Sequence, residues 1–235
     1  TPALKKSPKK LVFFKRDFQF YHQMQKLIRI KQIFTADIFK ISFLNAIAVL
    51  IKMLTAFVSM KAVANILGAA GPMGIAMLGQ LNNLTAILLA ASNGGINNGI
   101  TRYIAENAKP FLGTGFWITA VLSVVCGLVL IIGAGFFASH ILKDIQYITV
   151  FYIFGVTVIL YGLNTLLISV INGFKEFKKY VIANILGSII GLVFTIVLAY
   201  NFGIFGALIA AVTYQSIVFI LTLFLVLNTK WFKPR

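Results

Sequence analysis

Long apolar runs, each able to cross a bilayer, follow one another along the chain from residue 41 onward. The first, 41–67, reads ISFLNAIAVLIKMLTAFVSMKAVANIL, and at about 1.5 Å per residue it exceeds a hydrocarbon core of roughly 30 Å. Runs of this length are helices, because a membrane-spanning segment must satisfy its own backbone polar groups and barrel strands are shorter. The pattern predicts six membrane-spanning helices, at 41–67, 73–98, 114–139, 147–172, 180–200 and 204–228.

Composition places the chain among all-α integral membrane proteins. It is 60% hydrophobic and 11% charged, with a mean hydropathy of +0.94, whereas soluble domains are about 25% charged. The net charge of +16 comes mainly from basic residues at the flanks of the apolar runs. There it is explained by membrane orientation and attraction to anionic lipid headgroups, so we expect membrane lipids and no nucleic acid as partners.

Basic residues also predict the orientation of the chain. They gather in residues 1–40, 99–112 and 173–179 and at the end of the chain, whereas the alternate connections carry only Lys143, which Asp144 balances. Because basic loops remain in the cytoplasm, both termini are predicted to be cytoplasmic. The predicted organisation is a basic cytoplasmic extension (1–40), a six-helix transmembrane lobe (41–230) and a basic cytoplasmic end (231–235). We further expect Met24 to be the natural initiator, with residues 1–23 an upstream extension.

A lysine near the middle of the first apolar run requires a physical reason. Intramembrane lysines cost about 2.5 to 3.5 kcal/mol on insertion scales and usually face a bundle interior or a water-filled cavity. Asn45 and Ser59, seven positions either side of Lys52, share its helix face within about 20°, and Thr55 lies about 60° away. Lys61 points to the opposite side. A polar cavity wall is one interpretation; snorkelling of Lys52 and ordinary packing of the small polar residues is the other.

Three further runs carry polar strips. The second run is rich in amides, including Asn83, Asn93 and Asn98, its last residue; the fourth has Tyr161 and Asn164. The fifth has four strip residues at helical spacing, namely Asn184, Ser188, Gly191 and Thr195. Strips that face inward would enclose a mostly uncharged cavity with Lys52 on its wall, suited to sugar hydroxyls and a phosphate. Alternatively, the strips pack against one another and leave no cavity.

The sequence offers no catalytic constellation, so we expect a transporter rather than an enzyme, without cofactor or metal. His22 and His140 are far apart, Cys126 is the single cysteine, and all five acidic residues lie outside the predicted spans. Proton- or sodium-coupled transporters commonly keep an intramembrane carboxylate. No phosphate-binding Gly-x-x-x-x-Gly-Lys-Ser/Thr motif is present, which excludes an ATP-driven pump within this chain.

Arg102 follows a glycine-rich stretch, SNGGINNG, that is expected to loosen or end the second helix near the cytoplasmic face. Two roles are open for Arg102. It can bind a diphosphate in bidentate fashion, or it can anchor the helix in the anionic leaflet. The candidate substrate-binding residues are therefore Lys52, Asn45, Ser59, Asn83, Asn93, Asn98, Arg102, Tyr161 and Asn164.

Two motifs give the chain a resemblance to a known family. G-P-x-G-I at 71–75 and G-I-x-N-G-I-T-R-Y at 95–103 resemble the second-helix region of the Wzx-type O-antigen and enterobacterial-common-antigen translocases. These belong to the polysaccharide branch of the flippase superfamily that also includes the MATE exporters. The resemblance extends more loosely from about residue 41 to residue 230.

The resemblance implies a MATE-like fold of which these six helices form the N-terminal lobe only. It implies transport of an undecaprenyl-diphosphate-linked oligosaccharide from the cytoplasmic to the periplasmic leaflet of the bacterial inner membrane, for surface polysaccharide synthesis such as that of O-antigen lipopolysaccharide. A second six-helix lobe, from the same gene or a second chain, would be the partner. The family also implies cationic cavity residues, which Lys52 and Arg102 would supply. The alternatives are a MATE-like small-molecule exporter and a non-transporting, truncated membrane scaffold.

Overall fold

The computed structural model describes residue 39 and residues 42–93, 95–107 and 111–227. The chain divides into two units, Thr1–Ile47 and Ala48–Arg235. Of the first unit, residues 39 and 42–47 are described and are helical. The second unit begins with helical residues 48–67 and continues with η1 (Gly68–Ala70), α2 (Gly71–Asn93), α3 (Ile96–Asn107), α4 (Phe111–Ile132), α5 (Ala134–Ile141), η2 (Ile145–Tyr147), α6 (Ile148–Gly173) and α7 (Phe177–Leu227).

Four helical stretches of the described chain are long and apolar enough to cross a membrane. They are Ser42–Ser92, Gly113–Ile132, Ile145–Gly173 and Phe177–Leu227. Together with the absence of strands from the residues described, they confirm the predicted all-α, multi-pass membrane protein. Six separate passes and the domain limits stay predictions.

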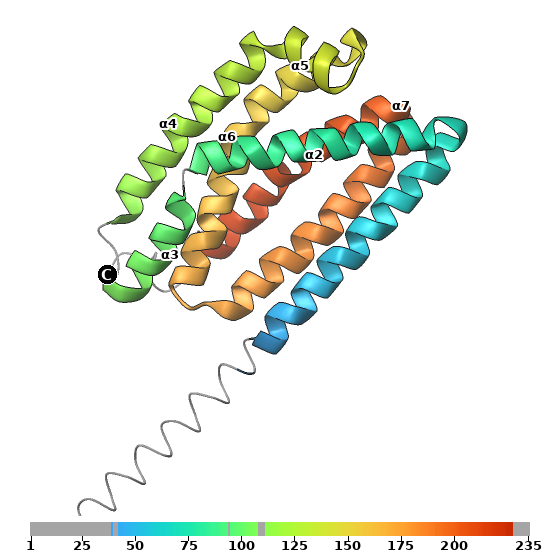
Figure 1. The fold of residues 1–235 in the computed structure, drawn as a ribbon. Helices are drawn as coiled ribbons and strands as arrows, with labels where there is room; N and C mark the ends of the chain where they lie inside the picture. The colour runs from blue at the N-terminus through green and yellow to red at the C-terminus, as the bar shows by residue number, and fades with distance from the viewer. Residues whose placement is uncertain (1–38, 40–41, 94, 108–110, 228–235) are drawn as a thin grey trace, which may run out of the picture. The chain divides into compact units, whose positions relative to one another are not determined.

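Two of these four stretches contain a break at a glycine. Each is 51 residues long, or about 76 Å of continuous helix, more than twice the bilayer core. Gly68 has φ +54°, and Gly203, inside α7, has φ +60° and ψ −138°, a conformation that glycine adopts without a Cβ penalty. Figure 1 shows the chain reversing at a turn after residues 48–67 and continuing as α2. It also shows the orange and red halves of α7 meeting at one end.

Helix ends depart from the prediction where glycines or an amphipathic pattern intervene. The helix predicted at 73–98 ends at Asn93, and Gly95 has φ +74°. The residues predicted as a loop at 99–112 are helical as far as Asn107. Ile100 and Ile104 on this helix, α3, are buried in a cluster with α6, so an apolar stripe at a spacing of four stabilises a helix that overall hydropathy did not indicate.

The helix predicted at 114–139 is also interrupted by a glycine. The helix α4 ends at Ile132, and α5 begins after Gly133. A Cβ atom at Gly133 would lie 3.0 Å from the backbone oxygen of Val129 and closer still to the ring of Phe137. The remaining predicted helices, 147–172, 180–200 and 204–228, agree with α6 and the two halves of α7 within a few residues.

The core of the second unit lies around α6, which packs against both α4 and α7. Phe151 and Phe154 of α6 are fully buried. The helices α4 and α6 approach closely where Gly127 faces Gly155, since a Cβ atom at Gly155 would lie 2.8 Å from the backbone oxygen of Gly127. Such small residues let helix backbones pack tightly in a membrane, where the hydrophobic effect does not drive helices together.

We expect Gly155→Ala to lower the free energy of unfolding by about 1–3 kcal/mol, because the new methyl group must push α4 away from α6. The measurement is a denaturation titration in mixed detergent micelles, followed by far-UV circular dichroism. Gly79→Ala in α2 is the control, because a Cβ atom there has no neighbour within 4 Å. Equal stability of the Gly155→Ala variant and the wild type would contradict this close packing.

Candidate functional site

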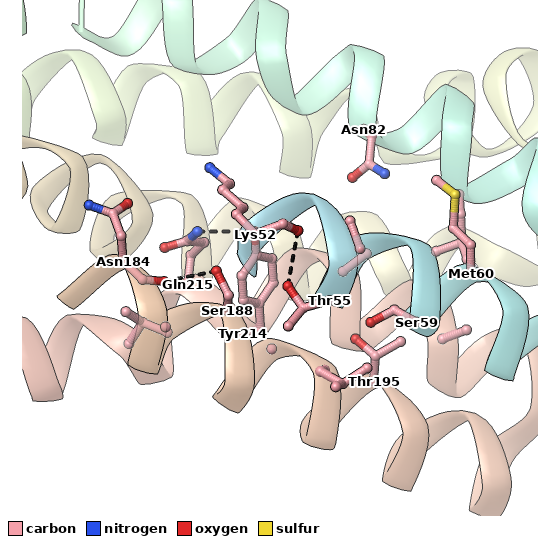
Figure 2. Close-up of a pocket in the computed structure, with 18 of the residues that line it drawn as sticks. Lys52, Thr55, Ser59, Met60, Asn82, Asn184, Ser188, Thr195, Tyr214 and Gln215 are labelled. Atoms are coloured by element: carbon pink, nitrogen blue, oxygen red, sulfur yellow. Dashed lines mark hydrogen bonds between the residues drawn. The ribbon is translucent and has the colours of Figure 1, made fainter. Parts of the chain in front are cut away.

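A pocket of about 200 Å³ lies within the second unit. Its walls come from helical residues 48–67, from α2 and from both halves of α7, with one contribution from α6 (Figure 2). The polar lining residues are Lys52, Thr55, Ser59, Asn82, Asn184, Ser188, Thr195, Tyr214 and Gln215. The polar strips of two predicted spans therefore face a hollow rather than only each other.

Lys52, Thr55 and Ser59 form one wall of the pocket, as their helical spacing predicts. Lys52 is exposed, and within the described part of the chain no carboxylate pairs with it. Lys52 is also the only charged side chain among the described residues that line the pocket. The positive charge of Lys52 is therefore available to attract an anionic group of a ligand that enters the pocket.

The first half of α7 forms the facing wall. Asn184, Ser188, Gly191 and Thr195, at intervals of three or four residues, all line the pocket, as expected for residues on one face of a helix. Figure 2 shows Asn184, Ser188 and Thr195 spread along the orange helix, beside the blue helix that carries Lys52, Thr55 and Ser59. The two polar strips thus run along the same hollow.

Several wall side chains use their donor hydrogens within their own helix. Thr55 Oγ1 donates to the backbone oxygens of Lys52 (2.9 Å) and Ile51 (3.0 Å). Ser188 Oγ donates to the Asn184 oxygen (2.8 Å), and Asn184 Nδ2 donates to the Tyr180 oxygen (2.9 Å). Their oxygen lone pairs remain for other partners. These residues therefore offer the pocket acceptors, suited to the hydroxyl hydrogens of a ligand.

A hydrogen-bonded group from α6 and the second half of α7 forms another part of the wall. Gln215 Nε2 donates to the Tyr214 hydroxyl (3.0 Å), and Gln215 Oε1 accepts from Asn164 Nδ2 (2.7 Å). The Tyr161 hydroxyl is hydrogen-bonded to that of Tyr214. Tyr214 and Gln215 line the pocket, whereas Tyr161 and Asn164 stand behind them. We call these four residues the tyrosine–amide network.

The predicted site residues are only partly brought together. Lys52 and Ser59 line the pocket, and Tyr161 and Asn164 reach it through their partners. Asn83 is exposed on α2, while its neighbour Asn82 is the one that lines the pocket. Asn98 and Arg102, which lie exposed on α3, are also outside the pocket lining and have no bond to a lining residue among those given above.

Two predicted site residues are described only in part. Asn45 belongs to the first unit, where it is half-buried and its Oδ1 has no hydrogen-bond partner among the described residues. Asn93 is the last residue of α2, and its side chain lies outside the described part. The described lining of the pocket therefore includes neither residue.

Sequence reasoning missed Tyr214 and Gln215. Both lie in the run Thr213, Tyr214, Gln215 and Ser216, four adjacent polar residues that point all around a helix and so give no periodic face. A polar cluster in the middle of an otherwise apolar span was the available signal, because such residues usually bond to other helices or line cavities. No group of three or more metal-ligating side chains occurs within the described residues.

We expect cysteines placed at Ser59 or Thr195, in a Cys126→Ser background, to react with a membrane-impermeant maleimide, because a polar pocket with a cation admits water. Matched cysteines at Val158, which is fully buried, and at Ile87, which is exposed on an apolar surface, should remain unlabelled. The measurement is the mass shift of the purified protein after labelling in intact membranes. Labelling of the Ile87 position but not of the pocket positions would overturn the assignment.

Comparison with known proteins agrees with a role in polysaccharide synthesis. A family model described as polysaccharide biosynthesis protein matches residues 71–234, from the start of α2 to the penultimate residue of the chain. No curated protein and no solved structure matches. The matched region includes α2, which carries Asn82, and all of α7, which supplies most of the polar pocket residues. The chain belongs to the polysaccharide biosynthesis protein family.

Proposed function

We propose that this chain translocates an undecaprenyl-diphosphate-linked oligosaccharide from the cytoplasmic to the periplasmic leaflet of the bacterial inner membrane. The observation that carries the proposal is Lys52, an unpaired cation within the described residues, on the wall of a polar pocket between membrane helices. The physical task of a flippase is to shield a polar headgroup from hydrocarbon while a lipid tail stays in the bilayer. The pocket offers a cation for the phosphate of such a headgroup, and hydroxyl and amide groups for its sugar.

The charge of the pocket favours this substrate over a cationic cargo. Lys52 attracts a phosphate, and the surrounding hydroxyls and amides suit sugar hydroxyls. An exporter of organic cations would require anionic or aromatic partners. Among the described lining residues there is no carboxylate, and the one aromatic side chain, Tyr214, shares the pocket with the positive charge of Lys52. The substrate would therefore bind with its diphosphate at Lys52 and its sugar along the hydroxyl-lined walls.

In this proposal the 51-residue stretches Ser42–Ser92 and Phe177–Leu227 each cross the membrane twice, with their reversals at Gly68 and Gly203. The chain then has six passes, both termini in the cytoplasm, and a basic connection at 173–179 on the same side. Six helices form one lobe of a MATE-like transporter, and a second six-helix lobe completes the path by alternating access. Arg102, exposed on α3, lies at the cytoplasmic side, where it binds the diphosphate or anchors α3.

We expect Lys52→Ala to reduce surface glycan at least about tenfold in a strain whose export depends on this protein, because the phosphate loses its charge partner. The measurement is surface glycan by antibody or lectin binding, with membrane insertion checked by immunoblotting. Lys61→Ala is the matched control: it removes a lysine of the same helix, and Lys61 does not line the pocket. Undiminished export by the Lys52→Ala variant would remove Lys52 from the transport path.

A further inference from the structure

The pocket is too small for an oligosaccharide. Its volume of about 200 Å³ lies below the roughly 300–1,000 Å³ of pockets that enclose drug-sized ligands. At about 30 Å³ per molecule of liquid water, it holds about seven waters. One sugar ring is of this order, whereas a chain of sugars must extend beyond the pocket. If the proposed function holds, the pocket therefore binds a single sugar unit of the substrate.

The sugar unit that can enter is the one attached to the diphosphate. Lys52 is the only cation among the described lining residues, so the phosphate next to the sugar is held at this point. Tyr214 and Gln215 line the same hollow as Lys52, and all three are labelled in Figure 2. A sugar bonded to a phosphate at Lys52 therefore lies in the hollow that Tyr214 and Gln215 line.

Tyr214 and Gln215 have the chemistry for a sugar ring. Both are half-buried, and the tyrosine ring offers an apolar face that matches the C–H face of a pyranose, together with a polar hydroxyl. Gln215 Nε2 uses one hydrogen on Tyr214 and keeps the second for a ligand oxygen. Asn184 and Ser188 of the same pocket offer acceptors for sugar hydroxyls.

The position of these two side chains depends on the residues that pack against them and bond to them. Asn164 is fully buried, and its bond of 2.7 Å fixes the Gln215 amide. Gly191 provides the space for the tyrosine ring, because a Cβ atom there would lie 2.9 Å from Tyr214 Cδ2. The Tyr161 hydroxyl supports the Tyr214 hydroxyl from behind. Both pocket side chains are therefore held before any ligand arrives.

We infer that Tyr214 and Gln215 form a specificity site for the first sugar of the lipid-linked substrate, and that Asn164 and Gly191 are positioning residues that hold this site in shape. The inference rests on the proposed function and adds to it which part of the substrate is recognised and by which residues. Lys52 then provides affinity for the diphosphate common to all such lipids. The tyrosine–amide network discriminates between lipids that differ at the first sugar.

The test compares two probes on the purified full chain in lipid nanodiscs, by native mass spectrometry. One probe is undecaprenyl diphosphate, and the other is the same lipid bearing a single N-acetylglucosamine. Wild type should bind the sugar-bearing lipid about tenfold more tightly, since a site built for hydrogen bonds penalises a ligand without them. Tyr214→Leu, Asn164→Ala and Gly191→Ala should each lose this preference while still binding the sugar-free lipid.

Two comparisons give the test its controls. Thr157→Val removes another hydrogen bond between α6 and α7, from Thr157 Oγ1 to the Val212 oxygen at 3.1 Å, and should keep the sugar preference. Lys52→Ala should weaken the binding of both lipids alike. Binding of the sugar-free lipid shows that the pocket is intact. A variant that binds neither lipid is therefore misfolded. The other two of the three variants then show whether the sugar preference depends on the network.

Different binding results would overturn the specificity site and the flippase proposal. If wild type binds both lipids with equal affinity, or if the three variants weaken both probes in the same proportion, the specificity site is overturned and the flippase proposal stands. If wild type binds neither lipid, the proposed function fails and the inference fails with it. Loss of the sugar preference in the Thr157→Val variant would also overturn the inference, because any weakening between α6 and α7 would then suffice.

Discussion

An ammonium group inside a membrane must be solvated by water, by a ligand or by an opposite charge, and the arrangement around Lys52 meets this constraint. Its cost in hydrocarbon, about 2.5 to 3.5 kcal/mol on insertion scales, is reduced because the side chain lines a pocket whose walls also carry hydroxyl and amide groups. The pocket exists because the chain turns back at Gly68 and again at Gly203. These reversals bring the helix of Lys52, α2 and both halves of α7 around one hollow.

Several donors on the walls of this hollow are already bonded. The hydroxyl hydrogens of Thr55 and Ser188 and one amide hydrogen of Asn184 bond to backbone oxygens of their own helices. A donor that is satisfied carries no penalty when the pocket is empty, and its oxygen can still accept a bond. In the proposed function, such a balance lets the site release the substrate as well as bind it.

The sequence predicted the parts of the site that follow helical periodicity. Lys52 and Ser59 share a face because they are seven residues apart, and the four strip residues of α7 share one for a similar reason. Periodicity cannot tell whether a polar strip meets a hollow or another helix. Thr157 and Asn164 of α6 bond to α7 instead of facing a ligand directly, as the alternative of mutually packed strips foresaw.

The fold was predictable to a similar degree. Hydropathy located the apolar segments, and the all-α membrane class followed from it. Hydropathy missed α3, whose stability comes from two isoleucines packed on α6. It also predicted one continuous helix across Gly133, where the structure has the end of α4 and the start of α5. Tyr214 and Gln215 were missed because they lie in a run of adjacent polar residues that gives no periodic face, and because Gln215 bonds to Asn164, 51 residues away in the chain. Contacts of this range are not visible in a local pattern.

Solid-state NMR can measure whether Lys52 holds the phosphate of a lipid-linked substrate, as we propose. The protein, with ¹⁵N-labelled lysine side chains, is reconstituted with undecaprenyl diphosphate, and dipolar dephasing is measured between ³¹P and the lysine Nζ. The account predicts a dephased lysine signal that disappears in the Lys52→Ala variant and persists in the Lys61→Ala variant. Absence of dephasing when the lipid is bound, or its persistence in the Lys52→Ala variant, would contradict the account.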